Sequence, residues 1–112
     1  MIVVITAKDQ SVESRIDDRF GRSPWLIRVD TKSNQWEALE NPGASQSGGA
    51  GVAAAQFTID QKAAIVVSGA FGPHAASAFR AAKIKMCLFT KGVQTVQQVI
   101  DLMANDQLPE FK

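Results

Sequence analysis

The sequence predicts an α/β fold built on a mostly parallel sheet. Three short apolar runs carry this prediction: MIVVIT at residues 1–6, AAIVVSG at 63–69 and IKMCLF at 84–89. Continuous runs of this kind, rich in β-branched side chains, are typical of strands buried on both faces. Segments with helical periodicity lie before and after the second run, as parallel strands joined by crossover helices require.

Two more strands are predicted in the first half of the chain. In WLIRVD at 25–30, Trp25, Ile27 and Val29 recur with the period of two that is typical of a strand. The turn residues TKSN lead into QWEALE at 35–40, a more polar strand that suits a sheet edge. The charged segment AKDQSVESRIDDRFGRS, before the first of these strands, is too long for a tight turn.

Three helices are predicted from helical spacing and from their start signals. Pro73 fits a first helical position, and Thr95 with Gln98 matches a capping box. The apolar residues at helical spacing are Val52, Ala55 and Ile59 in the first helix, which runs to about Lys62; Ala76, Phe79 and Ala82 in the second; and Val96, Val99, Ile100 and Met103 in the third.

The resulting order, β-β-β-α-β-α-β-α, restricts the sheet topology. Right-handed crossovers make the buried strands parallel, and the early hairpins make the second strand antiparallel to the first. A five-stranded mixed sheet of order 3-2-1-4-5 with helices on both faces satisfies both conditions, and this is the ribonuclease H-like arrangement. A flavodoxin-like order also fits the pattern. Residues 1–112 are interpreted as a single domain.

The composition excludes several function classes. Twelve basic and eleven acidic residues give a net charge of +1, which provides no electrostatic reason to expect nucleic acid or a membrane as partner. One cysteine excludes an intramolecular disulfide and a CxxC-type zinc site. No apolar stretch approaches the ~20 residues of a transmembrane helix. The first residues lack the basic region of a signal peptide, so a cytoplasmic protein is predicted.

One edge of the predicted sheet collects the features that suit a ligand site. The loops at residues 7–22, 41–51, 69–73 and 90–94 follow strands that point the same way, and they contain the glycines of the chain. Ligands of open α/β sheets bind outside the carboxyl ends of the strands. The sequence therefore predicts a binding site at this edge.

The stretch ENPGASQSGGAGVAAAQ at residues 40–56 is the most conspicuous of these loops. It meets the start of a helix, where unpaired amides and the helix dipole favour an anion. Gly48, Gly49 and Gly51 let the backbone approach such a ligand closely. Because the stretch is neither GxGxxG nor a Walker loop, no nucleotide cofactor is expected. The alternative interpretation is a mobile connection that needs positive φ angles.

Two further turns reach the same edge. RFGR at 19–22 places Arg19 and Arg22 where they can pair with an anionic ligand. The alternative is that Arg19 pairs with Asp17 or Asp18 and that Phe20 only anchors the loop.

The second turn, FGPHA at 71–75, places His74 in the first turn of a helix. The helix dipole there favours a neutral imidazole, which can ligate a metal; the alternative is a surface histidine without a role. Cys87 lies in the middle of a strand between Met86 and Leu88 and is expected in the core.

Three segments together resemble one known family. They are DDRFGRSPWLIRVD, ENPGASQSGGAGVAAAQ and VVSGAFGPHAASAFRAAKIKM. This ordered set of an RFGR-like turn, an ENP…GG.G loop and a G.GP turn is similar to the dinitrogenase iron–molybdenum cofactor-binding family. That family includes nitrogenase cofactor carriers and the molybdenum–copper "orange protein". The similarity spans essentially all 112 residues.

The resemblance implies a ribonuclease H-like fold and a small accessory or carrier protein without turnover of its own. The implied ligand is an anionic iron–molybdenum or molybdenum–copper sulfide cluster, and the implied partners are cluster-assembly or cluster-receiving proteins. The positions carried over as site-lining are Arg19, Phe20, Gly21, Gly48, Gly49, Gly51, Gly72 and Pro73. Arg22 and His74 are added from the residues themselves, with His74 as the candidate metal ligand.

Two other functions are considered. A nuclease of this fold needs carboxylates on its central strands to hold two divalent ions. MIVVIT and VVSG contain none, so an enzyme is not expected. A regulatory or interaction module would instead use the exposed strand edge at 35–40, with Trp36 placed against a second chain or packed on its own domain.

Overall fold

Five strands form one mixed sheet in the computed structural model, which describes residues 1–111 of the chain. The strands are β1 (Ile2–Ala7), β2 (Trp25–Asp30), β3 (Gln35–Glu40), β4 (Ile65–Ser68) and β5 (Lys85–Leu88). Their order is β3-β2-β1-β4-β5; β2 runs antiparallel to both of its neighbours, whereas β1, β4 and β5 are parallel. The predicted order is confirmed, and the flavodoxin-like order is wrong.

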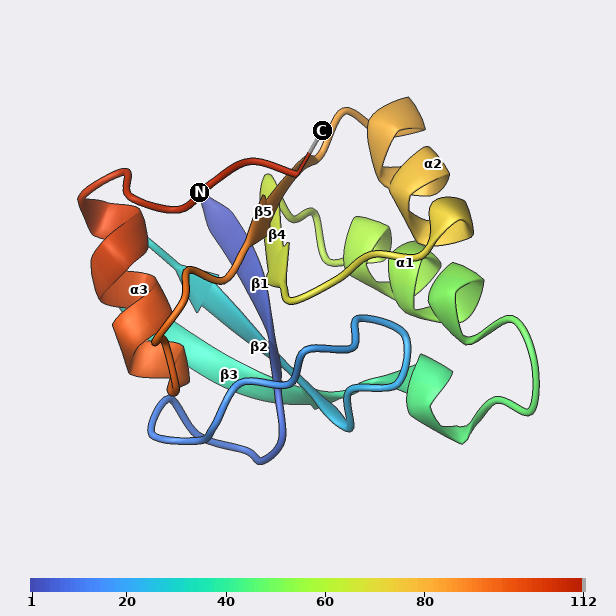
Figure 1. Cartoon of the computed structure of the whole chain (residues 1–112), viewed down its shortest axis with the longest axis horizontal. Coiled ribbons are helices and arrows are strands. Elements are labelled where there is room, and N and C mark those ends of the chain that lie inside the picture. Colours follow the sequence, from blue (N-terminus) through green and yellow to red (C-terminus); the bar gives the residue numbers. More distant parts are fainter. Residues whose placement is uncertain (112) are drawn as a thin grey trace.

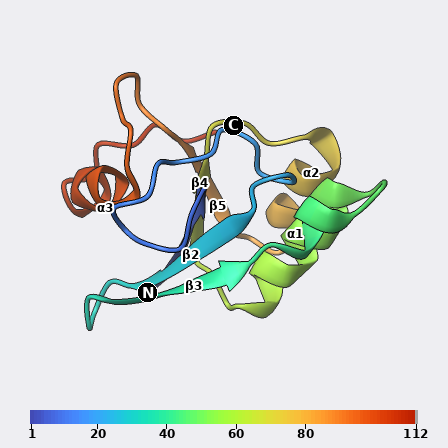
Figure 2. The same cartoon turned by 90° about the horizontal axis from the view of Figure 1, so that it is seen from below.

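Helices cover both faces of the sheet. The α-helices are α1 (Ala50–Asp60), α2 (Pro73–Ala81) and α3 (Val96–Ala104), and a short 3₁₀ helix that the sequence did not predict, η1 (Pro42–Ser45), precedes α1. Figures 1 and 2 show α1 and α2 on one face and α3 on the other. The capping box of Thr95 and Gln98 is present at the start of α3. None of the helices described over residues 1–111 is long and apolar enough to cross a membrane.

The sheet separates two apolar cores. The core beneath α1 and α2 contains Val4, Leu26, Val66 and Met86 together with Phe20, Phe71 and Phe79. The core beneath α3 contains Val3, Ile5, Ile27, Val67, Cys87, Val96 and Val99. Alternate residues of β1 and β4 therefore lie in opposite cores. Because both faces of these strands are buried, their sequences are uninterrupted apolar runs.

Two residues that were predicted to face the core lie at the surface. Val52 is 53% exposed, and α1 instead buries Ala54, Ala55 and Thr58. Ala82 is exposed because α2 ends one residue earlier and Ala82 becomes its C-cap. The small side chains buried by α1 bring its backbone close to the neighbouring loops, which matters for the candidate site.

The two outer edges of the sheet differ. Residues near the C-terminus cover β5: the amide of Leu88 donates to the Pro109 carbonyl at 2.8 Å, and the amide of Phe111 donates to the Met86 carbonyl at 2.8 Å. Figure 1 shows this last segment running beside β5. Strand β3 forms the opposite edge, and its Trp36 is 42% exposed. Within the described residues, β3 is thus the uncovered edge.

Candidate functional site

The loops that follow β1, β3 and β4 come together at the carboxyl end of the sheet (Figure 1). Arg19 forms a parallel bridge with Ala70, next to the start of α2. A Cβ atom at Gly21 would lie 3.0 Å from the amide nitrogen of Gly51, and one at Gly69 would lie 2.7 Å from the Cα atom of Asp18. The RFGR turn is therefore packed between the glycine-rich loop and the β4–α2 turn, and the three predicted segments do meet.

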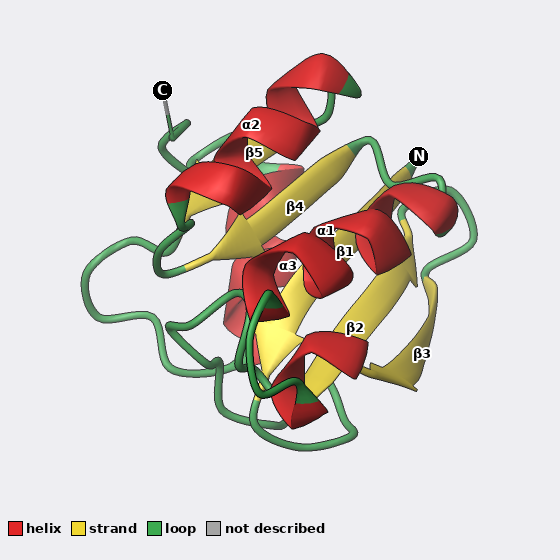
Figure 3. Ribbon diagram, turned by 90° about the vertical axis from the view of Figure 1, so that its right-hand side faces the viewer, coloured by secondary structure: helices red, strands yellow, loops and turns green. Residues whose placement is uncertain are grey.

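The first turns of α1 and α2 lie beside each other. A Cβ atom at Gly51 would lie 3.8 Å from that of Ala75, and Figure 3 shows the two helices across the same face of the sheet. Gly49, with a φ of 70°, caps α1, and Gly72 caps α2 ahead of Pro73. The first amides of a helix have no partner within the helix, and glycine has no side chain to cap them. Two sets of amide donors are thus gathered in one region.

Small buried polar side chains fasten the β1–β2 loop to the strand ends. The Thr6 hydroxyl, at the end of β1, donates to the Asp17 carbonyl at 2.6 Å, and its oxygen lies 3.1 Å from Ser68 Oγ, at the end of β4. Ser23 Oγ lies 2.9 Å from the Ala7 carbonyl oxygen and 2.7 Å from that of Trp25.

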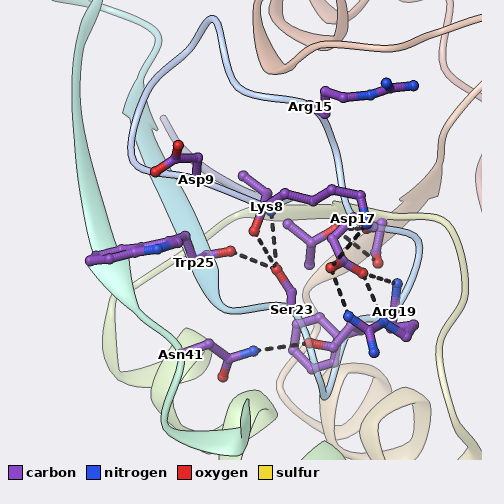
Figure 4. A network of polar contacts seen from close by, with 12 residues as sticks. Lys8, Asp9, Arg15, Asp17, Arg19, Ser23, Trp25 and Asn41 are labelled. Atoms are coloured by element: carbon purple, nitrogen blue, oxygen red, sulfur yellow. Dashed lines mark hydrogen bonds and ion pairs between the residues drawn. The ribbon is translucent and has the colours of Figure 1, made fainter.

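Asn41 extends this fastening to the glycine-rich loop. Its Nδ2 donates to the Phe20 carbonyl at 3.1 Å, and its Oδ1 accepts from the Gly43 amide at 3.0 Å. Figure 4 shows Asn41 and Ser23 in this network, with dashed lines that mark their hydrogen bonds. Sequence reasoning assigned no role to Thr6, Ser23 or Asn41, because a lone hydroxyl or amide at a strand end carries no periodic signal.

Asp17 is a buried carboxylate that holds two cations (Figure 4). Its side chain is 1% exposed; its Oδ1 accepts from Arg19 N at 2.9 Å and Nε at 3.2 Å, and its Oδ2 accepts from Arg19 Nη2 at 3.1 Å. Lys8 Nζ lies 3.7 Å from the same Oδ2. Burial by itself would raise the pKa of Asp17, but the hydrogen bonds from Arg19 and the charges of Arg19 and Lys8 lower the pKa overall.

The alternative interpretation of the RFGR turn is confirmed in two respects. Arg19 pairs with Asp17, although its side chain remains 63% exposed. Phe20 is buried, and its ring centroid lies 5.6 Å from that of Phe71 and 5.2 Å from that of Phe79. Phe20 therefore anchors the loop in the core. The exposed Arg22 donates through Nη1 to the Gln46 carbonyl, which links the RFGR turn to the glycine-rich loop.

Open space surrounds the tip of the glycine-rich loop. Apart from its own residue and its two chain neighbours, a Cβ atom at Gly48 or Gly49 would meet no atom of residues 1–111 within 4 Å. His74 is exposed in the first turn of α2. A second opening, of about 310 Å³, lies between the β1–β2 loop and residues 93–94, and Lys8 and Arg15 line it.

Histidine and cysteine are common metal ligands, but the single histidine and the single cysteine of this chain do not lie together. Cys87 is buried in the core beneath α3, and burial raises the pKa of its thiol. His74 belongs to α2, which packs on the other face of the sheet. Within residues 1–111, no group of three His, Cys, Asp or Glu side chains is placed to hold a metal ion. Amides and guanidinium groups are among the donors at this edge.

Comparison with known proteins gives matches over nearly the whole chain. The family model described as dinitrogenase iron-molybdenum cofactor matches residues 1–106. The apo form of the orange protein from Desulfovibrio gigas is 31% identical, with a TM-score of 0.90 over 98% of this chain and 92% of that one. A NifB-like protein from Thermotoga is 28% identical, with a TM-score of 0.83 over 97% and 91% of the two chains. No curated protein sequence matches the chain.

Proposed function

The chain belongs to the dinitrogenase iron–molybdenum cofactor family, and on that premise we propose that it is a non-catalytic carrier of an anionic metal–sulfur cluster. The cluster is cargo, of the iron–molybdenum or molybdenum–copper sulfide type. The observation that carries the proposal is the meeting of the RFGR turn, the glycine-rich loop and the first turn of α2 at one edge of the sheet.

The donor set at this edge suits an anion that is already assembled. Amides at the starts of α1 and α2 and the guanidinium of Arg19 donate hydrogen bonds, and sulfide atoms at the surface of a cluster accept them. Gly48 and Gly49 leave room for a bulky ligand to approach the backbone. A thiolate bond from Cys87 does not fit, because that side chain is buried beneath α3.

The proposed site residues have two kinds of role. Contact with the anion is assigned to Arg19, Arg22, Gly48, Gly49, Gly51, Gly72 and His74. Phe20, Gly21 and Pro73 support them: Phe20 fills the core, Gly21 allows the close approach to Gly51, and Pro73 starts α2. His74 adds one ring nitrogen, as a metal ligand or a hydrogen-bond donor.

Tetrathiomolybdate is a suitable probe because it is an anionic molybdenum sulfide. The apoprotein is incubated with it anaerobically and desalted, and retained molybdenum is measured together with the absorbance spectrum. We expect the wild type to retain the anion and Arg19→Ala/Arg22→Ala to retain about ten-fold less. Lys32→Ala is the control for loss of a cation away from the site, because Lys32 is exposed in the β2–β3 turn, at the other end of β2. Absence of retention by the wild type would contradict the proposal.

A second candidate function is favoured by Trp36. This residue is 42% exposed on β3, the uncovered edge of the sheet within the described residues. Edge strands recruit partner strands, and exposed aromatic side chains anchor interfaces. A protein-interaction module would show concentration-dependent association in light scattering that Trp36→Ala abolishes. A monomer at all concentrations, with no partner retained through β3, would count against this function.

A further inference from the structure

We propose that Asp17 is a positioning residue for the cargo: its buried carboxylate gathers Lys8 and Arg19 into one cationic contact that faces the anion. This inference rests on the proposed function, because it requires an anionic ligand at the carboxyl edge of the sheet. It adds Lys8 and Asp17, which sequence reasoning did not assign to the site, and it explains why a carboxylate lies where an anion is to bind.

Asp17 is fixed by the sheet even though it lies on a long loop. Its amide donates to the Thr6 carbonyl at 3.2 Å, and its own carbonyl accepts the Thr6 hydroxyl at 2.6 Å. That hydroxyl also contacts Ser68 at the end of β4. The carboxylate is thus held against the ends of the two central strands, so the cations that bind it are held there as well.

The two cations use only part of their donors on Asp17. Arg19 approaches side-on through Nε and Nη2, which leaves the outer N–H groups of the guanidinium free for a ligand. Lys8 Nζ lies 3.7 Å from Oδ2, and the Lys8 side chain is 55% exposed. Since both cations contact the same oxygen atom, they lie near each other despite their like charge. The carboxylate offsets their repulsion, and the group retains one net positive charge.

A purely structural Asp17 makes the opposite prediction for binding. If Asp17 only fastens the loop, its negative charge repels the anion, and Asp17→Asn would tighten binding. If Asp17 positions the two cations, the neutral amide holds them poorly and binding weakens. The sign of the change in affinity therefore separates the two roles.

The experiment measures tetrathiomolybdate affinity for five single variants beside the wild type. We expect Asp17→Asn to weaken binding at least five-fold, and Asp18→Asn, an exposed neighbour with the same change of charge, to bind as well as or better than the wild type. Lys8→Gln should weaken binding three- to ten-fold. Arg19→Lys keeps the charge but loses the side-on pair and should weaken binding similarly, while Lys32→Arg should not.

Combining two substitutions tests whether Asp17 acts through Arg19. The double variant Asp17→Asn/Arg19→Lys should bind no more weakly than the weaker-binding of the two single variants. Either single change already removes the side-on pair of Arg19 with Asp17, so the second change has nothing further to remove. If Asp17→Asn does not fold, Lys8→Gln and Arg19→Lys, which leave the buried carboxylate in place, decide the question. Wild-type binding with unchanged affinity in these variants overturns this inference alone. No binding by the wild type overturns the proposed function as well.

Discussion

Gly43 packs so closely against Gly21 that a Cβ atom at residue 43 would lie 2.5 Å from the Gly21 carbonyl oxygen. The same atom would lie 2.5 Å from the Ala50 carbonyl oxygen. Both obstacles are backbone atoms, which cannot swing aside as a flexible side chain would. The contact holds together η1, the RFGR turn and the start of α1, and so it fixes the geometry of the whole edge.

The first prediction concerns this contact. Gly43→Ala should lower the free energy of unfolding by about 1–3 kcal/mol, because the added methyl group forces backbone segments apart. Urea denaturation followed by tryptophan fluorescence measures the change. Gly48→Ala is the control: its Cβ would meet no described atom within 4 Å, so its unfolding midpoint should stay close to that of the wild type. Equal unfolding midpoints for the two variants would show that the loop shifts to accommodate the methyl group at little cost in stability.

The second prediction is a pH dependence of stability. The folded-state pKa of Asp17 is lowered, so its ionised form stabilises the fold at pH values above the ordinary Asp value of about 3.9. This contribution is lost as the pH falls through the lowered folded-state pKa.

The free energy of unfolding of the wild type should therefore fall more steeply below about pH 4 than that of Asp17→Asn. Chemical denaturation at a series of pH values gives both curves, and the other acids titrate equally in each. Parallel curves would mean that Arg19 and Lys8 do not lower the folded-state pKa of Asp17.

The third prediction concerns the thiol of Cys87. Burial raises its pKa and covers the sulfur, so alkylation of the folded protein at neutral pH should be slow. We expect the rate to rise at least about 100-fold in denaturing urea, because reaction requires opening of the core beneath α3. The same reagent with a small free thiol sets the reference rate. Rapid labelling of the folded protein would show that this core opens readily.

The fourth prediction concerns His74. Because His74 is exposed, His74→Ala should leave the thermal unfolding midpoint nearly unchanged. Molybdenum and sulfide retained after anaerobic purification should fall by roughly two- to ten-fold, since amides and arginines would still hold part of the cargo. Ser77→Ala, an exposed change one turn further along α2, is the control. Equal metal content in wild type and His74→Ala would remove His74 from the site.

The order of the sheet could be predicted because few topologies satisfy the handedness of crossovers. The apolar runs at β1 and β4 identified the central strands, and the early hairpins fixed β2 and β3. The face of α1 could not be predicted in the same way. Its first half is mostly alanine and glycine, so several faces look equally apolar, and Val52 was assigned to the core although it lies at the surface.

The site was predicted as a set of loops but not as a set of contacts. Arg19 and Phe20 were recognised, with both of their possible roles, because the RFGR turn is distinctive. Nothing in the sequence indicated that Lys8 and Thr6 contribute to the site. Both contact Asp17, which lies on an irregular loop whose path the sequence does not specify. Pairing across such a loop depends on tertiary structure, and periodicity carries no information about it.

The segment that runs along β5 also limits how this protein can assemble. With residues 109–111 bonded to β5, β3 is the outer named strand whose far side pairs with no described segment. Pairing of two chains through β3 would therefore give a closed pair.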